Sequence, residues 1–162
     1  GQTPLGTATA STHDDKIVIA TVFRAGLPLH TGFLNMFDHA DNAFVSAFRF
    51  YKDDEHHIVD VHIEYIAAPS LNDRTLLLVD PMLATGESME LAWKAFLTKG
   101  KPAKLQMACV IASQQGVKHM AELFPGDDVT LWCAAIDPVL DEHKYIVPGL
   151  GDAGDLSFGE KL

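Results

Sequence analysis

Residues 75–88 of this chain have the sequence TLLLVDPMLATGES, which predicts a buried strand, a loop and the start of a helix. The run 75–79 is short, apolar and uninterrupted, as is typical of a parallel strand buried on both faces. A helix should follow the loop, because apolar residues recur there at helical spacing and Gly100 with Pro102 supplies a stop. The apolar positions of this helix are Met89, Trp93, Phe96 and Leu97.

Strands and helices alternate on both sides of this stretch. Apolar runs predict further strands at 17–22, 104–112 and 129–135, and helical patterns predict helices at 27–37 and 114–124. Such alternation predicts an α/β fold, with a mostly parallel sheet covered by helices on both faces.

Two more strands are predicted at 44–51 and 58–66, with a polar stretch between them. Their close spacing predicts a β-hairpin arm. Residues 1–15 show little periodicity, so we expect an irregular lead-in there and one domain over residues 16–162.

The composition excludes several classes of protein. The chain has 162 residues with 22 Asp plus Glu against 12 Lys plus Arg, a net charge of −10, which disfavours an extended nucleic-acid surface. No apolar run approaches the ~18 residues that cross a bilayer. Cys109 and Cys133 are too few for a disulfide framework, and we expect a reduced, cytoplasmic protein.

The loop of residues 80–88 is a candidate anion site. Ligands of open parallel sheets bind outside the carboxyl ends of the strands, and backbone N–H groups at a helix start form a concave site for phosphate. Gly86 permits close approach, and Thr85 and Ser88 can donate hydroxyl hydrogen bonds. A plain helix cap is the alternative, and the Walker pattern is absent.

Two of the three arginines, Arg24 and Arg49, lie near the ends of other predicted strands. An arginine at such a position can bind a phosphate group, but it more often forms a surface ion pair. No histidine spacing indicates a metal site, because adjacent strand residues such as His56 and His57 point to opposite faces.

Two long motifs together resemble the uracil phosphoribosyltransferase family. Residues 79–86 (VDPMLATG) are similar to the family's loop for phosphoribosyl pyrophosphate, and residues 145–155 (YIVPGLGDAGD) are similar to its uracil-binding segment. Arg24 and Arg49, with their neighbours, match family positions that bind the donor. The resemblance covers residue 16 to the end and implies a phosphoribosyltransferase-type fold of type I.

The resemblance implies transfer of the 5-phosphoribosyl group from phosphoribosyl pyrophosphate to uracil, giving UMP and pyrophosphate in pyrimidine salvage. It assigns the donor to Arg24, Arg49, Asp80, Pro81, Met82, Leu83, Ala84, Thr85, Gly86, Glu87, Ser88 and Asp152. It assigns uracil to Ile146, Gly151, Asp152 and Ala153.

Asp152 is the candidate catalytic residue, stabilising the developing cation or helping uracil lose its N1 proton; a plain turn carboxylate is the alternative. Mg²⁺ is the implied cofactor, held through substrate and water rather than by an all-protein metal site.

Two residues depart from the family pattern. Glu87 stands where the family commonly has glycine, and Leu156 stands where a basic residue often follows. The alternative functions are the same transfer to another base, or a non-catalytic nucleotide-sensing or RNA-binding regulator of the same fold; the net charge counts against RNA. We expect small-molecule substrates, no nucleic acid, no membrane, and a homo-oligomer by family resemblance.

Overall fold

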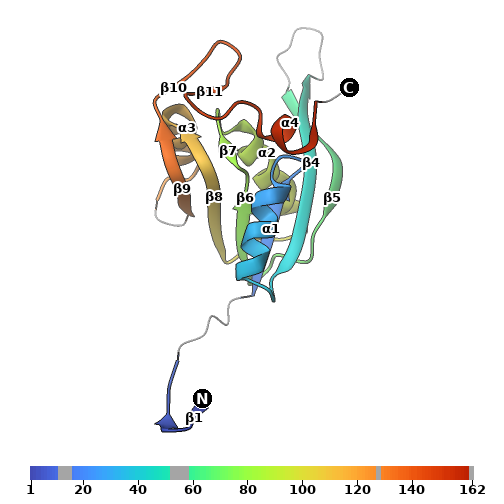
Figure 1. Cartoon of the computed structure of the whole chain (residues 1–162). Coiled ribbons are helices and arrows are strands. Elements are labelled where there is room, and N and C mark those ends of the chain that lie inside the picture. The colour runs from blue at the N-terminus through green and yellow to red at the C-terminus, as the bar shows by residue number, and fades with distance from the viewer. Residues whose placement is uncertain (11–15, 52–58, 127–128, 161–162) are drawn as a thin grey trace.

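The structure is a computed structural model that describes residues 1–10, 16–51, 59–126 and 129–160 (Figure 1). Within these ranges, the side chains of residues 47–51 and 59–62 lie outside the description. The predicted hairpin tip, with His56 and His57, also lies outside it.

A seven-stranded, mostly parallel sheet forms the centre of the molecule. Five strands follow one another in the order β5 (Val59–Ala67), β4 (Asp41–Tyr51), β3 (Ile17–Val22), β6 (Thr75–Val79) and β8 (Lys104–Ser113). On its other side, β8 pairs with β9 (Val129–Asp137). The short β7 (Met82–Leu83) pairs with the last residues of β8. Among the described strands of this sheet, only β5 is antiparallel, and it pairs with β4 as the predicted hairpin. The α/β fold class and the hairpin are therefore confirmed.

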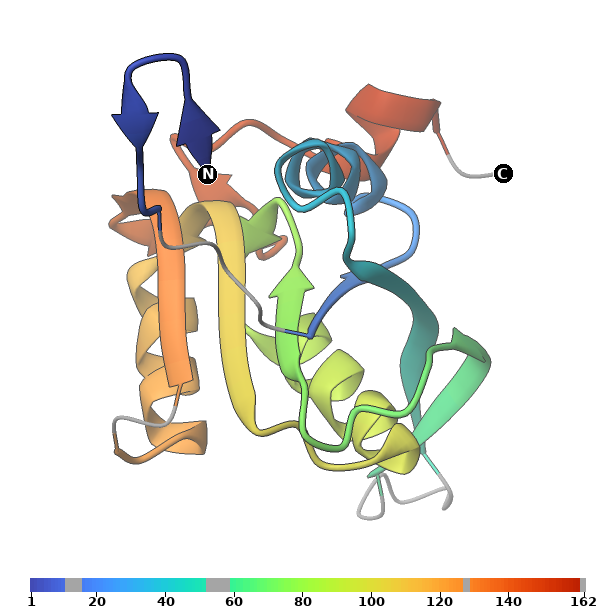
Figure 2. The same ribbon diagram turned by 90° about the horizontal axis from the view of Figure 1, so that it is seen from below.

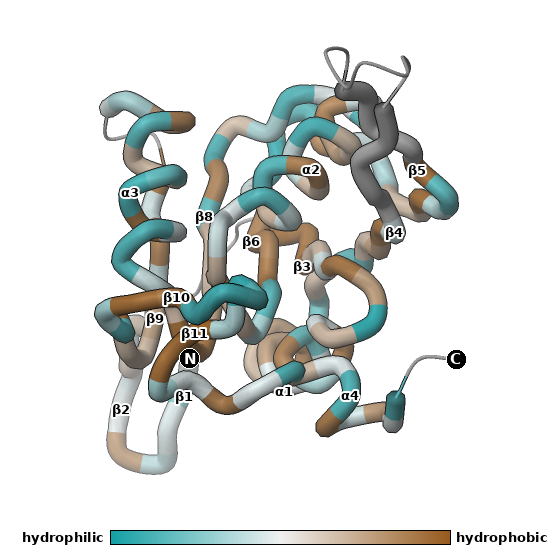
Figure 3. Tube along the Cα trace, turned by 90° about the horizontal axis from the view of Figure 1, so that it is seen from above, coloured by the Kyte–Doolittle hydropathy of each residue, from teal (hydrophilic) through white to brown (hydrophobic). Residues whose placement is uncertain are grey.

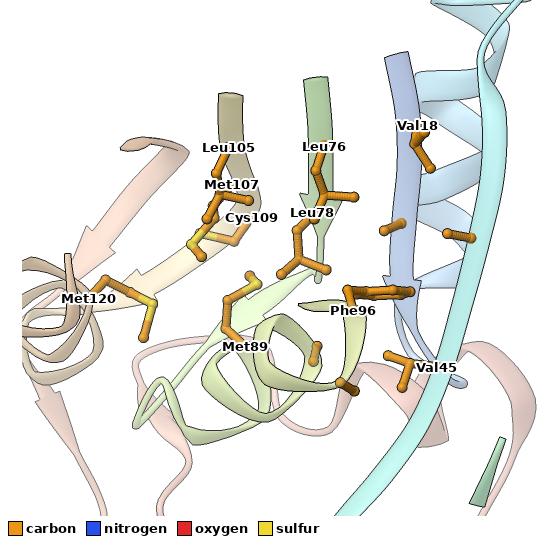
Figure 4. Packing of buried hydrophobic residues seen from close by; sticks show 14 of the residues in the cluster. Val18, Val45, Leu76, Leu78, Met89, Phe96, Leu105, Met107, Cys109 and Met120 are labelled. Carbon is orange, nitrogen blue, oxygen red and sulfur yellow. The ribbon is translucent and has the colours of Figure 1, made fainter. Parts of the chain in front are cut away.

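The helices lie on both faces of the sheet. One face carries α1 (Leu27–Met36), and the other carries α2 (Glu87–Phe96), the short 3₁₀ turn η1 (Leu97–Lys99) and α3 (Gln114–Leu123) (Figures 1 and 2). The larger core lies under α2, where Phe96 and Met89 pack against Leu76 and Leu78 of β6 (Figure 4). Met89 and Phe96 of the predicted apolar face are thus confirmed as core residues, and Trp93 packs partly buried against them, whereas Leu97 lies on η1 and is 41% exposed.

Helices cover the α1 face of the sheet unevenly. There α1 packs over Ile19, Leu77 and Val79. Farther along the same sheet, Trp132 and Ile136 of β9 are 60% and 51% exposed. Within the described residues, the expectation of helices on both faces therefore holds for the central strands but not for β9.

Three short ladders correct the sequence prediction. Within the expected irregular lead-in, β1 (Gln2–Thr3) and β2 (Gly6–Thr7) form an exposed antiparallel pair. The expected loop after β6 contains β7, which pairs with β8. The Gly-rich segment contains β11 (Ile146–Val147), paired with β10 (Val139–Leu140), and leads into α4 (Ala153–Phe158). Two-residue strands carry too little periodicity to be detected in sequence.

None of the helices in the described part of the chain has the length and apolar character needed to span a membrane.

Candidate active site

A cavity of about 240 Å³ opens at the carboxyl ends of β3 and β6. Figure 3 looks onto this end of the sheet, along which the segment from β10 to α4 runs. Three loops far apart in sequence line the cavity: the β3–α1 loop, the β6–α2 loop and residues 144–154. The lining residues are Phe23, Arg24, Ala25, Asp80, Met82, Ala84, Ser88, Lys144, Tyr145, Gly151, Asp152, Ala153 and Gly154.

The β6–α2 loop presents alternate residues to the cavity. Asp80, Met82, Ala84 and Ser88 line it, whereas Leu83 is buried in the core because β7 pairs with β8 there. The remaining predicted loop residues are absent from the lining, namely Pro81, Thr85, Gly86 and Glu87. The pleat of β7 thus directs Met82 and Leu83, which the sequence motif groups together, to opposite sides.

Gly86 ends this loop in the left-handed conformation, with φ of +87°. A β-carbon there would lie 2.9 Å from His119 Cδ2 and 2.9 Å from Met120 Cε, so both the backbone and the available space require glycine. Glu87 is the first residue of α2, where the helix dipole favours a negative charge. This position explains how the chain tolerates Glu87 in place of the glycine common in the family.

Asp80 follows β6 at the floor of the cavity. Burial raises the pKa of its carboxyl group from 3.8 to about 7, and the backbone N–H of Met82, which donates to Oδ1 at 3.3 Å, offsets part of that rise. Asp80 therefore changes charge near neutral pH, within the range where the cavity would bind a substrate.

Raising the pH through 7 should strengthen binding of a hydroxylated anionic donor, because ionised Asp80 accepts hydrogen bonds better than its protonated form. We expect the KM for phosphoribosyl pyrophosphate to fall by up to about tenfold between pH 6 and pH 8. The donor's own phosphates titrate too, so Asp80→Asn is the control, and its pH profile should be flatter. Identical profiles in the two proteins would contradict this prediction.

The same pKa rise has an opposite effect on stability. Between pH ~4 and ~7 the folded protein holds a proton on Asp80 that the unfolded chain releases, so the contribution of Asp80 to the unfolding free energy falls as pH rises. Urea unfolding of wild type and Asp80→Asn across this range measures that contribution.

Arg24 follows β3 and bonds to the C-terminal segment. Its Nη2 donates to Asp155 Oδ1 at 2.6 Å, and its Nη1 donates to the carbonyl oxygen of Gly159 at 2.7 Å. Its Nε is buried and has no hydrogen-bond partner among the described residues. One donor of the guanidinium group is therefore still unsatisfied at the cavity wall.

Arg49 lies on β4, opposite Val61 of β5. Its side chain is outside the described part of the structure. Its role in binding a donor remains a prediction from the family motif.

Asp152 has two roles in the geometry. It caps α4, with Oδ1 accepting from the backbone N–H of Asp155 at 2.9 Å, and it also lines the cavity. A β-carbon on Gly154 would lie 3.1 Å from Asp152 Oδ1, so a larger residue there would press on this carboxyl group, whereas Arg24 Nε at 3.8 Å is in ordinary contact distance. Asp152 is therefore a turn carboxylate, as the alternative reading of the sequence proposed. The same turn places its carboxyl group at the cavity.

The predicted uracil segment contributes Gly151, Asp152 and Ala153 to the cavity. Ile146 is 2% exposed and does not line it, because its side chain is directed into the interior from β11. The structure therefore does not bring Ile146 together with the other predicted uracil residues.

Asp137, at the end of β9, anchors this segment. Its Oδ2 accepts from the backbone N–H of Gly149 at 2.9 Å. Gly149 itself has φ of +51°, and a β-carbon there would lie 2.0 Å from the carbonyl oxygen of Ile146. The Asp137 carboxylate and the tight glycine turn together fix the path of the chain that leads to Gly151.

Replacing Asp137 with alanine should raise the KM for uracil about tenfold or more while leaving the donor KM within about twofold. A hydrogen bond to a charged group contributes roughly 1.5–3 kcal/mol, and its loss frees the segment at Gly149. Steady-state kinetics with each substrate varied in turn measures the two constants. Asp137→Asn keeps an acceptor and should remain closer to wild type, whereas equal rises in both KM values would contradict this assignment.

The sequence reasoning missed Phe23 and Lys144 as cavity residues, and it included Ala25, Tyr145 and Gly154 only as members of the substrate motifs. Lys144 carried a detectable signal, because it is the only Lys or Arg between Lys118 and Lys161 and it directly precedes the uracil motif. Among the described residues, no group of three or more His, Cys, Asp or Glu side chains is arranged to hold a metal.

Comparison with known proteins agrees with the two motifs. The family model described as uracil phosphoribosyltransferase matches residues 1–160. The uracil phosphoribosyltransferase of Porphyromonas gingivalis is 61% identical over 160 residues, which cover 99% of this chain and 73% of that protein.

Two solved structures share the fold. A protein of Aquifex aeolicus superimposes with a TM-score of 0.80 and 29% identity, over 100% of this chain and 74% of that one. A hypoxanthine phosphoribosyltransferase from Staphylococcus aureus superimposes with a TM-score of 0.57 at 11% identity, over 84% of this chain and 73% of that one, and so shows the fold alone. Motifs, cavity and relatives agree: this chain belongs to the uracil phosphoribosyltransferase family.

Proposed function

We propose that this chain transfers the 5-phosphoribosyl group of phosphoribosyl pyrophosphate to uracil, giving UMP and pyrophosphate. One observation carries the proposal: a single cavity at the carboxyl ends of the strands joins the donor loop after β6 with the uracil segment near the C-terminus. The family and its printed name for the Porphyromonas gingivalis relative support the same reaction.

The donor is assigned to the side of the cavity formed by the β6–α2 loop. Backbone N–H groups at the start of α2 and the Ser88 hydroxyl bind the 5′-phosphate, and Asp80 accepts from the ribose hydroxyls. Arg24, with Arg49 from β4, neutralises the leaving pyrophosphate. Lys144 adds a third positive charge at the cavity wall.

Uracil is assigned to the side formed by residues 145–154. It presents two carbonyl acceptors and one N–H donor, which backbone groups of a Gly-rich turn can match without side chains in the way. Cytosine reverses donor and acceptor at one position and leaves buried groups unpaired, so it is rejected strongly.

The transfer breaks the bond between the ribose and pyrophosphate, forms a bond to uracil N1 and releases the N1 proton. As pyrophosphate leaves, positive charge develops on the ribose, and the nearby carboxylate of Asp152 stabilises it or accepts the N1 proton of uracil. The three loops hold both substrates in position next to one another.

The residues present fit a Mg²⁺ ion that arrives with the donor. Two carboxylates, Asp80 and Asp152, line the cavity and can accept hydrogen bonds from water molecules on such an ion. The ion, when bound, neutralises pyrophosphate charge, and we assign most of its ligands to substrate and water.

We also propose a homo-oligomer and a cytoplasmic location. The exposed Trp132 and Ile136 on β9 favour burial in an assembly. Cys109 and Cys133, opposite one another on β8 and β9, are free thiols, in keeping with a reducing compartment. Light scattering during gel filtration measures the oligomeric state.

The test is incubation with the Mg²⁺ complex of phosphoribosyl pyrophosphate and either uracil, cytosine or hypoxanthine, with separation of the products. UMP should form from uracil alone. Formation of another nucleotide instead would refute the base assignment. RNA binding that weakens as salt is added, without formation of any nucleotide, would instead favour a non-catalytic RNA-binding regulator of the same fold.

A further inference from the structure

One face of α3 lies against the back of the donor loop, on the side away from the cavity. Ser113, Gly116 and His119 form this face, and we call it the α3 support face. Ser113 is the N-cap of α3, and Gly116 and His119 follow in the helix at the three-residue spacing that keeps side chains on one side. None of them lines the cavity.

Ser113 bonds the loop to the start of α3. Its side chain is completely buried, and its hydroxyl donates to the carbonyl oxygen of Ala84 at 2.5 Å while accepting from the backbone N–H of Gly116 at 2.9 Å. Ala84 lines the cavity, so this one hydroxyl links the helix cap to a loop residue of the site.

Gly116 lets the loop backbone lie directly on the helix. A β-carbon at this position would be 2.6 Å from the carbonyl oxygens of both Leu83 and Ala84, against 3.4 Å or more for ordinary contact. Both neighbours belong to the backbone and cannot rotate away as a side-chain end can. Any larger residue must therefore displace the loop.

His119 supports the end of the loop one turn later. Its ring packs on Gly86, where a β-carbon would lie 2.9 Å from Cδ2. Its Nε2 lies 2.9 Å from Oε2 of the buried Glu90, whose Oε1 accepts from Lys94 Nζ at 2.5 Å. Glu90 of α2 thus fixes the position of the His119 ring, and the ring in turn packs against Gly86.

We propose that the α3 support face positions the donor loop, and that Ser113, Gly116 and His119 are positioning residues for binding of phosphoribosyl pyrophosphate. This inference rests on the proposed function of residues 80–88 as the donor loop. The contacts reach Ala84 and Gly86, directly before the start of α2, whose N–H groups are assigned to the 5′-phosphate. A rigid support keeps these groups aligned before the donor arrives, and displacement by about 1 Å can cost two orders of magnitude.

The test compares Gly116→Ala and His119→Ala with Gln115→Ala, which changes an exposed residue of the same helix. We expect the donor KM to rise about 10–100-fold in Gly116→Ala and about 3–10-fold in His119→Ala, with the uracil KM within about twofold of wild type. Gln115→Ala should match wild type in both constants. A purely structural role would lower the melting temperature without separating the two KM values.

Calorimetric titration with the Mg²⁺ complex of phosphoribosyl pyrophosphate distinguishes failure of the proposed function from failure of the positioning role. Absence of UMP from wild type refutes the proposed function, whereas equal donor Kd values in wild type and His119→Ala refute the positioning role. Parallel rises in the donor and uracil constants would also refute it. If Gly116→Ala does not fold, His119→Ala, which changes a partly exposed side chain, still decides the matter.

Discussion

Replacing Asp152 with asparagine should lower kcat about 100-fold or more while leaving the protein folded. Asparagine caps helices about as well as aspartate, so its side-chain oxygen can still accept from the backbone N–H of Asp155. What it removes is the negative charge beside the reacting ribose. General acid–base groups contribute about 10²–10⁴-fold, and loss of a preorganised charge has effects of similar size.

Asp152→Ala is the matched variant, because it removes both the charge and the cap. It should lose at least as much turnover and, in addition, about 1 kcal/mol of unfolding free energy that Asp152→Asn retains. Stopped assays for UMP at saturating substrates, together with urea unfolding, measure the two effects. Unchanged turnover in Asp152→Asn would leave the carboxylate with its capping role only.

Replacing Arg24 with glutamine should raise the KM for phosphoribosyl pyrophosphate about 100-fold. The guanidinium group is a permanent charge that binds phosphate oxygens in pairs, and hydrogen bonds to charged groups contribute roughly 1.5–3 kcal/mol each. Its buried Nε has no partner in the described residues, so a bound anion would satisfy it. Glutamine keeps some polarity but neither the charge nor the fork.

Arg74→Gln is the control, because it removes the same charge from an arginine that is absent from the cavity lining and pairs with Asp41. Its donor KM should stay within about twofold of wild type. Equal effects in the two variants would show that net charge, and not the Arg24 site, governs the donor KM.

Asp155→Asn provides the reverse test. Asp155 holds Arg24 Nη2 in the structure and so competes with the anion for it. Neutralising Asp155 should leave the donor KM unchanged or lower it up to about tenfold, since a partly exposed ion pair contributes little. A large rise would mean that the ion pair places Arg24 for binding.

The proposed site reconciles a net charge of −10 with the binding of a highly charged donor. Arg24 and Lys144 lie at the cavity, and most of the 5′-phosphate contact is assigned to uncharged N–H and hydroxyl groups. Because binding depends on these local groups, the total charge excludes only an extended polyanion.

Prediction from sequence succeeded where local pattern decides local structure. The strands 17–22 and 75–79 are found with the predicted bounds, because each apolar run is bordered by polar or turn residues. Prediction failed for the two-residue strands β7 and β11. Pairing with β8 orders β7, and pairing with β10 orders β11. The same pairing determines that Leu83 and Ile146 are directed into the interior, although the motifs group them with site residues.

The sequence by itself determined the α/β class, the two motifs and the family, because apolar periodicity and long motifs are properties of consecutive residues. Only the tertiary structure decided that Arg24 pairs with Asp155, that Asp152 both caps α4 and lines the cavity, and that α3 supports the donor loop. Apart from the Asp152 cap, which is local, these contacts join residues far apart in the chain. Their geometry depends on how the sheet and helices pack, which no local pattern contains.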